Sequence, residues 1–171
     1  MAIVQRMSSK NEFLKQVQEN ITFAFQPIVN IHTGDCFGFE ALLRNHKLVG
    51  VESIPALFDH ACELGVLHHV DSILREIAVR RFAALPLNDN SMLFFNIDGR
   101  LFENADGELE ETTTLFREFD LQTQSFCLEL SEAYDNESAR NIGDVLKICR
   151  EQGFLLAIDD FGRGFSEMKM L

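Results

Sequence analysis

The 171-residue sequence has no tryptophan, only three prolines and few basic residues. Fifteen lysines and arginines stand against 27 acidic residues, which leaves a net charge of -12. No apolar run approaches the roughly 20 residues that span a bilayer, and the N-terminus lacks the apolar stretch of a secretion signal. These absences predict a cytoplasmic globular domain with no membrane contact by this segment. They also predict no affinity for nucleic acid polymers, because an acidic surface repels their phosphates.

The four cysteines are far apart and form no Cys-x-x-Cys pair. Each lies beside apolar residues, as Cys127 does between Phe126 and Leu128. This placement predicts buried, reduced thiols and no disulfide framework.

Hydrophobic periodicity and turn residues divide the chain into alternating helices and strands. The expected helices cover residues 10–20, 53–65, 67–85, 108–119, 136–152 and 166–171. The expected strands cover residues 21–28, 37–43, 92–97, 126–130 and 154–158. A short turn at 33–35 separates the first two strands, which suggests an antiparallel pair. The later strands are continuously apolar and alternate with helices, as in a parallel sheet covered by helices, so we predict an α/β fold.

The spacing of the later strands indicates a repeated strand–helix unit. Asn96 and Glu129 are 33 residues apart, and Glu129 and Asp159 are 30 apart. Doubly wound sheets and (β/α)8 barrels both use units of this length, so the spacing leaves both open. A whole barrel typically needs about 250 residues. The chain therefore holds about five strands of such a fold.

Oxygen-bearing side chains lie in or directly after four of the strands. They are Glu40, Asn96, Glu129 and the pair Asp159-Asp160. Because the carboxyl ends of parallel strands share one rim, we expect these side chains around one pocket. Clustered carboxylates repel each other unless a cation lies between them, and all-oxygen ligands favour Mg2+ or Mn2+. A single acid at a strand end is usually a helix N-cap, but four strands with the same feature favour a cation site.

The same residues fall within five ordered motifs. The motifs are Gln26-Pro27-Ile28, Gly38-Phe39-Glu40-Ala41-Leu42-Leu43-Arg44, Phe95-Asn96-Ile97, Glu129-Leu130-Ser131-Glu132 and the stretch from Ala157 to Ser166. In this order and spacing they resemble the EAL domain family, from about Phe23 to the C-terminus. The resemblance implies a TIM-like (β/α) barrel with an antiparallel first strand, present here as an incomplete barrel. We therefore expect an N-terminal helix in residues 1–20 and an EAL domain in residues 21–171, truncated after the Asp-Asp-Phe-Gly loop.

The resemblance also implies a function. Members of the family are metal-dependent phosphodiesterases of bacterial signalling that open cyclic di-GMP to linear pGpG. By resemblance, one Mg2+ or Mn2+ ion is held by residues matching Glu40, Asn96, Glu129 and Asp159. Asp159 and Asp160 would also serve a second ion, and a water between the ions would attack phosphorus.

Three further residues receive roles by resemblance. Arg44 matches an arginine that holds a substrate phosphate, which suits its forked donors. Leu42 matches a residue that packs near a guanine. Glu132 matches a carboxylate that anchors the loop 160–166. The catalytic residues implied are thus Glu40, Glu132, Asp159 and Asp160.

Departures from the family pattern leave an alternative open. Arg163, Phe165 and Glu167 stand where the family usually has threonine, tyrosine and serine. The family's later strands supply a lysine, a glutamate and a glutamine that would lie beyond Leu171. We expect the 171-residue chain by itself to be inactive and its open sheet edge to pair with the missing segment or with another copy, as a homodimer. The alternative function is a non-catalytic EAL module that binds cyclic di-GMP or a partner protein.

Overall fold

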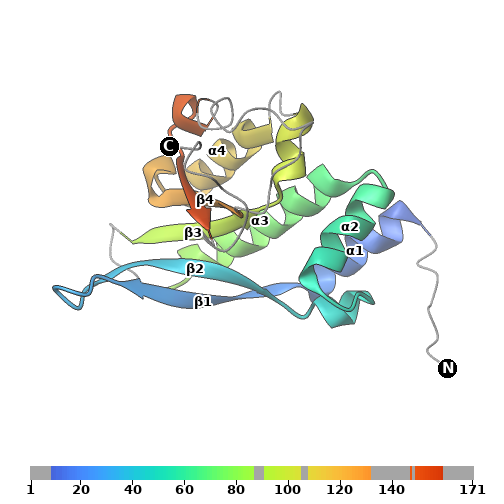
Figure 1. Ribbon diagram of the computed structural model, residues 1–171, viewed down its shortest axis with the longest axis horizontal. Helices are drawn as coiled ribbons and strands as arrows, with labels where there is room; N and C mark the ends of the chain where they lie inside the picture. Colours follow the sequence, from blue (N-terminus) through green and yellow to red (C-terminus); the bar gives the residue numbers. More distant parts are fainter. Residues whose placement is uncertain (1–8, 87–90, 105–107, 132–146, 148, 160–171) are drawn as a thin grey trace, which may run out of the picture.

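The computed structural model describes residues 9–86, 91–104, 108–131, 147 and 149–159 (Figure 1). The α-helices are α1 (Lys10–Asn20), α2 (Ile54–Glu63), α3 (Leu67–Ala83) and α4 (Glu108–Glu118). The strands are β1 (Thr22–Val29), β2 (Cys36–Arg44), β3 (Met92–Ile97), β4 (Phe126–Ser131) and β5 (Leu155–Asp159). Three short 3-10 helices are η1 (His46–Val49), η2 (Gly99–Asn104) and η3 (Thr123–Ser125). None of the helices within these ranges is long and apolar enough to cross a membrane.

Local capping explains where the first helices begin. The hydroxyl of Ser9 accepts a hydrogen bond from the backbone N–H of Glu12 at the start of α1. Ser53 caps α2 in the same way, and Pro55 occupies its first turn, where a missing N–H costs nothing. These signals are local in sequence, and the observed helix starts agree with the expected ones within one residue.

The five strands form one sheet in the order β1-β2-β3-β4-β5. β1 and β2 are antiparallel, with Gln26 opposite Glu40, and each later neighbour is parallel to the strand before it. The predicted α/β fold with an antiparallel first pair is confirmed. Within the described residues, β1 and β5 are the outer strands, so this part of the sheet remains open.

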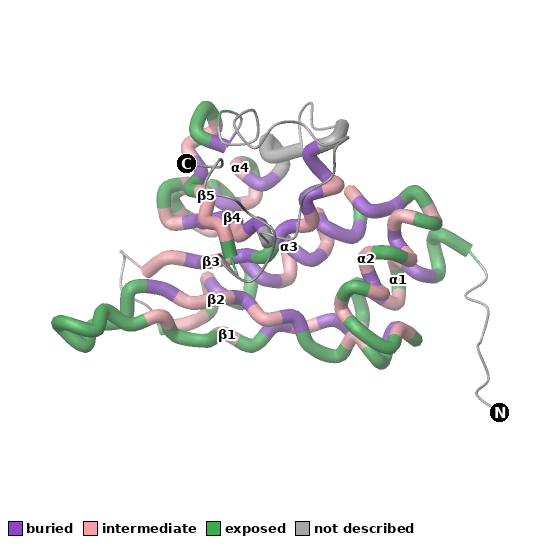
Figure 2. The backbone as a smooth tube through the Cα atoms, in the orientation of Figure 1, coloured by how far each residue is buried: buried purple, intermediate pink, exposed green. Residues whose placement is uncertain are grey.

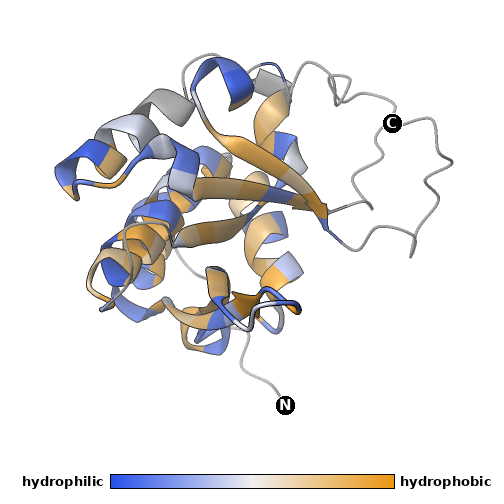
Figure 3. Ribbon diagram, turned by 90° about the vertical axis from the view of Figure 1, so that its left-hand side faces the viewer, coloured by the Kyte–Doolittle hydropathy of each residue, from blue (hydrophilic) through white to orange (hydrophobic). Residues whose placement is uncertain are grey.

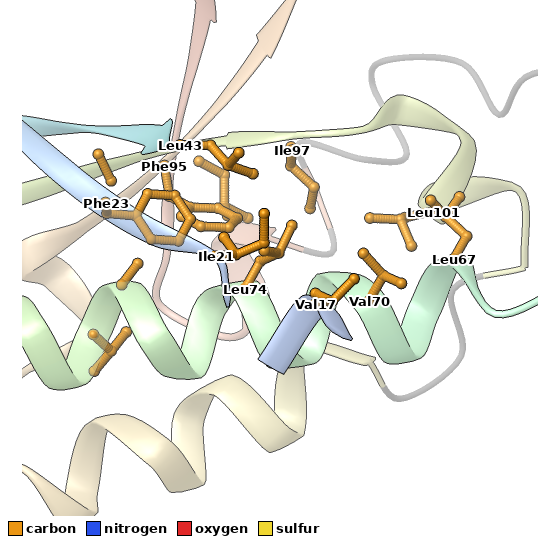
Figure 4. Packing of buried hydrophobic residues seen from close by; sticks show 14 of the residues in the cluster. Val17, Ile21, Phe23, Leu43, Leu67, Val70, Leu74, Phe95, Ile97 and Leu101 are labelled. Atoms are coloured by element: carbon orange, nitrogen blue, oxygen red, sulfur yellow. The ribbon is translucent and has the colours of Figure 1, made fainter. Parts of the chain in front are cut away.

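The core lies between the sheet and the helices. Figure 4 shows Val17 of α1, Phe23 of β1 and Phe95 of β3 close to Leu74 of α3. Buried residues run along α3 and the middle strands, whereas the turn of the β1–β2 hairpin is exposed (Figure 2). The strands are coloured mainly as hydrophobic, and the helices alternate between hydrophobic and hydrophilic residues (Figure 3). Hydrophobic burial on one side of the sheet therefore holds the helices in place.

Phenylalanines form a chain of ring contacts through the core. The ring of Phe126 on β4 lies 4.8 Å from that of Phe116 on α4, between centroids. It lies 5.8 Å from the ring of Phe154 and 6.0 Å from that of Phe95. Such tilted and edge-to-face pairs stabilise the packing beyond simple area burial. Phe126 thus packs against α4, β3 and Phe154, the residue just before β5.

Two features differ from the sequence-based expectation. Cys127 and Cys149 are buried as predicted, Cys62 is only half-buried, and Cys36 is exposed at the start of β2, so the prediction of buried thiols was wrong for Cys36. Its apolar neighbour Phe37 is itself 51% exposed, because this part of the hairpin extends past the helix layer. The expected helix 136–152 is described only at residues 147 and 149–151, which are helical. The expected helix 166–171 lies outside the described residues.

Candidate metal and substrate site

Three parallel strand pairings place the expected cation ligands on one face of the sheet. Asn96 of β3 lies opposite Glu129 of β4. Asp159 of β5 pairs with Ser131, two residues beyond Glu129 and hence on the same face. Glu40 of β2 pairs with Phe94, two residues before Asn96, and so shares that face as well. The opposite face of the same strands packs against the helices.

One hydrogen bond and one electrostatic effect link these side chains. The Nδ2 of Asn96 donates a hydrogen bond to Oε1 of Glu40, 3.0 Å away. The carboxylate of Glu129 interacts electrostatically with those of Glu40 and Asp159. Burial, followed by the negative charges of Glu40 and Asp159, raises the pKa of Glu129 from 4.5 to about 7. The four side chains therefore form one electrostatic unit.

The chemistry of this unit fits a divalent cation. Oε2 of Glu129 is buried and accepts no hydrogen bond from any described residue. A buried carboxylate oxygen among like charges is costly, and a cation would satisfy the oxygen and relieve the repulsion. Three carboxylates and one amide oxygen are hard ligands that suit Mg2+ or Mn2+. In the part of the chain that the structure describes, no group of three or more histidine, cysteine, aspartate or glutamate side chains is arranged so that it could hold a metal ion, so the fit is one of ligand chemistry and not of a finished ligand geometry.

A cavity of about 630 Å³ adjoins the unit through Asn96. It lies between the C-terminal ends of β2 and β3 and the first turns of α2, and Leu42 and Arg44 both line it. Its walls are mainly apolar and include Phe23, Ile54, Pro55, Phe58 and Leu130. Glu40, Glu129 and Asp159 do not line it. An apolar hollow beside a cluster of acids, with Arg44 at its edge, can hold a ring system and position an attached anionic group near the acids.

Sequence reasoning missed a second charged group at this cavity. Arg100 of η2 donates from Nε and Nη2 to the two carboxylate oxygens of Asp98, at 2.9 and 2.6 Å. Its Nη1 donates to Oδ1 of Asp59 on α2, 2.9 Å away. All three residues line the cavity. The available signal was the charged segment Asp98-Gly99-Arg100 directly after a strand end, where parallel sheets place functional groups.

Two expected site residues lie outside the described residues. Glu132 follows β4 directly, and Asp160 follows β5 directly. Their roles as loop anchor and second-cation ligand therefore stay predictions. The altered loop positions Arg163, Phe165 and Glu167 also lie outside the described part of the chain.

Comparison with known sequences supports one family. Residues 10–171 match the EAL domain family. A cyclic di-GMP phosphodiesterase of Pseudomonas aeruginosa is 32% identical to the chain over 157 residues. The match covers 90% of this chain and 26% of that protein, so the chain spans about a quarter of this relative's length.

Comparison with solved structures gives the same result. The EAL enzyme Bd1971, solved with cAMP and cyclic di-GMP bound, has a TM-score of 0.71 and 30% identity, over 92% of this chain and 45% of that one. BlrP1 of Klebsiella pneumoniae, solved with calcium and cyclic di-GMP, has a TM-score of 0.69 and 26% identity, over 89% of this chain and 37% of that one. The same protein has also been solved with manganese and cyclic di-GMP.

The five-stranded sheet, with its antiparallel first pair, thus corresponds to part of the EAL barrel. The sequence motifs, the sheet topology and the matches over most of the chain agree. The chain belongs to the EAL domain family and is homologous to cyclic di-GMP phosphodiesterases.

Proposed function

We propose that this chain forms the cation- and substrate-binding part of a phosphodiesterase that hydrolyses cyclic di-GMP to pGpG. The observation that carries the proposal is the convergence of Glu40, Asn96, Glu129 and Asp159 on one face, with Glu129 carrying a raised pKa among like charges. One relative is a cyclic di-GMP phosphodiesterase, and the EAL enzyme Bd1971 has been solved with cyclic di-GMP bound. An acidic site needs a cation before it can accept a substrate with two phosphates.

One set of residues would bind the cation and another the substrate. Glu40, Asn96, Glu129 and Asp159, together with Asp160, would hold Mg2+ or Mn2+. A bound divalent cation supplies positive charge that stabilises the phosphate and makes the attacking water more acidic. The Nδ2 of Asn96 donates to Oε1 of Glu40, and this hydrogen bond holds both side chains in place. Because the two side chains are already ordered, cation binding loses less free energy to ordering them.

Arg44 and Leu42 would bind the substrate. Arg44 ends β2 at the edge of the cavity, where its guanidinium can bind a phosphate oxygen with two donors. Leu42 lies two residues earlier and contributes to the apolar lining, against which a guanine ring can pack. The cavity is large enough for one guanine nucleoside, and its apolar walls exclude water from around the base.

The test separates binding from hydrolysis. Calorimetry of the purified chain with cyclic di-GMP in Ca2+ measures binding to an intact substrate, because the Klebsiella relative was solved with both bound. We expect binding that requires the cation and is lost in Glu129→Gln. Hydrolysis is assayed as pGpG release, first from this chain, where we expect none. It is then assayed from this chain joined to the remaining barrel strands of a solved relative, where we expect turnover that Glu40→Ala abolishes.

The result also decides between enzyme and binding module. Cation-dependent binding with no turnover by the completed barrel would favour the non-catalytic EAL module. Absence of cyclic di-GMP binding in the presence of Ca2+ and Mn2+ would refute both forms of the proposal.

A further inference from the structure

Arg100 is the centre of a polar bridge between α2 and the segment that follows β3. Its guanidinium makes a two-pronged contact with Asp98 and a third hydrogen bond with Asp59. Asp98 also accepts a hydrogen bond from the backbone N–H of Arg100, at 3.0 Å. These contacts raise the pKa of Arg100 above its ordinary value, so the group stays charged at any pH at which the chain is folded.

The bridge joins two walls of the cavity that are far apart in sequence. Asp59 lies on the exposed side of α2, and Asp98 lies two residues after Asn96. The bridge thus connects the segment that follows Asn96 to the helix that carries Pro55 and Phe58 of the apolar wall.

An ion pair with this exposure contributes little to stability. The side chain of Arg100 is 31% exposed and that of Asp59 is 64% exposed. Partly exposed pairs stabilise folded proteins by about 0–1 kcal/mol, because water screens them and ordering long side chains costs entropy. The planar fork of arginine nevertheless fixes the direction between its partners, which a lysine ammonium cannot do. The geometry favours a role in orientation over a role in holding the fold together.

We propose that Arg100 is a positioning residue that holds α2 and the end of β3 in the arrangement required for cyclic di-GMP binding. This inference rests on the proposed function, because cyclic di-GMP is the ligand in question. Arg100 lines the cavity, but its three guanidinium nitrogens all donate to Asp59 and Asp98, so it acts through these two carboxylates. Its effect should therefore appear in ligand affinity and in local backbone protection, with little effect on the unfolding midpoint.

The matched control is Arg80 on α3. Its Nη2 lies 2.5 Å from Oε1 of Glu76 in an exposed ion pair one helical turn apart. Arg80 does not line the cavity. Arg80→Gln thus removes an arginine charge and an ion pair without touching either cavity wall.

The experiment measures cyclic di-GMP affinity in Ca2+ for the purified chain and four variants. We expect Arg100→Gln to weaken binding about tenfold, the scale seen when supporting residues around a site are removed. Arg100→Lys should weaken it nearly as much, because an ammonium cannot bridge both carboxylates. Arg80→Gln should change affinity by less than about twofold. Asp59→Asn combined with Arg100→Gln should bind no more weakly than Arg100→Gln alone, because both act through one bridge.

A second readout does not depend on any ligand. The backbone N–H of Leu101 donates to the carbonyl of Asp98, 3.0 Å away, inside the segment that Arg100 holds. Hydrogen exchange of this amide should accelerate in Arg100→Gln and stay unchanged in Arg80→Gln. If the wild-type chain binds cyclic di-GMP and Arg100→Gln binds equally well, or if Leu101 exchange is unchanged, the positioning role is wrong while the proposed function stands. If the wild-type chain does not bind, the proposed function fails and the role of Arg100 fails with it.

Discussion

The two faces of the same strands follow different physical rules. On the helix-facing side of β3, Leu93, Phe95 and Ile97 are all buried. On the other side, Asn96 is exposed and Phe94 is half-buried. β4 repeats the pattern, with Leu128 and Leu130 buried and Glu129 only partly so. One face is a packed core, and the other presents polar groups at its C-terminal end.

Within a single strand, the helix-facing residues contribute to stability and the site-facing residues to function. The helix-facing side contributes apolar burial, which is non-directional and roughly additive with area. The site-facing side brings like charges together and leaves a buried carboxylate oxygen unsatisfied, which costs stability until a cation binds. Substitutions on the helix-facing side should therefore reduce stability, whereas those on the site-facing side should mainly change cation binding or relieve charge repulsion.

Phe126→Ala should have the largest effect on folding. The side chain is fully buried and contacts three other phenylalanine rings, so its removal leaves a cavity between α4 and the sheet. We expect a loss of about 3–5 kcal/mol in the free energy of unfolding, measured by urea denaturation. Phe37→Ala on the exposed part of the hairpin is the control and should cost well under about 1 kcal/mol. Equal losses in the two variants would contradict the division between the faces.

Glu40→Ala should leave folding nearly intact and remove cation binding. It deletes one of four oxygen ligands and the acceptor of the Asn96 hydrogen bond. We expect Mn2+ affinity, measured by calorimetry, to fall by at least about 10- to 100-fold, because even residues that only support metal ligands cost this much. Glu19→Ala, in an exposed ion pair on α1, should bind Mn2+ like the wild type. Undiminished Mn2+ binding by Glu40→Ala would place the cation elsewhere.

Glu129→Gln should stabilise the cation-free chain, and more so at high pH. The pKa of Glu129 is about 7 in the folded chain against 4.5 in the unfolded chain, so the folded state binds the proton more tightly. Stability is therefore lost as pH rises from about 4.5 to 7, and the neutral glutamine avoids this loss. Allowing for solvent screening of a partly exposed group, we expect a gain of about 1 kcal/mol at pH 8 and little at pH 4. Urea denaturation in a chelator measures both values, and a larger gain at pH 4 would contradict the assigned cause.

The exposed and the buried cysteines should differ in chemical reactivity. Burial, followed by the charges of Glu129 and Cys149, raises the pKa of Cys127 to about 12, and burial raises that of Cys149 to about 11. Both thiols are therefore almost fully protonated at pH 8, and the thiolate is the reactive form. Iodoacetamide should label the exposed Cys36 first, as read by mass spectrometry of peptides. Labelling of Cys127 at the rate of Cys36 in the folded chain would show that the core beside β4 is open.

Much of the fold was predictable because its signals are local. The strand Met92–Ile97 was predicted with its observed bounds, and the helix from Leu67 differed only at its end. Continuous apolar runs and capping serines produce these elements whatever lies around them. The 3-10 helix η1 was not predicted, because it depends on Asn45 adopting a left-handed backbone conformation, with a φ of 69°. Such a conformation leaves no periodic pattern in the sequence.

The candidate site was likewise predictable only in part. Glu40, Asn96, Glu129 and Asp159 were expected on one rim because each lies in or ends a strand, and parallel pairing brings strand ends together. The contact of Arg100 with Asp59 joins residues 41 positions apart and was not expected. The exposure of Cys36 was also missed, because its apolar neighbour Phe37 suggested burial.

The sequence by itself determined the order of helices and strands, the alternation of buried and open positions along each strand, and which residues carry oxygen ligands. Those properties follow from backbone preferences and from the period of two in a β-strand. Only the tertiary structure decided that Glu129 carries a pKa of about 7, because that value depends on burial and on Glu40 and Asp159, which come from other strands. It also decided that Arg100 bridges α2 and β3, because a guanidinium selects its carboxylates by distance and direction after packing has brought the elements together.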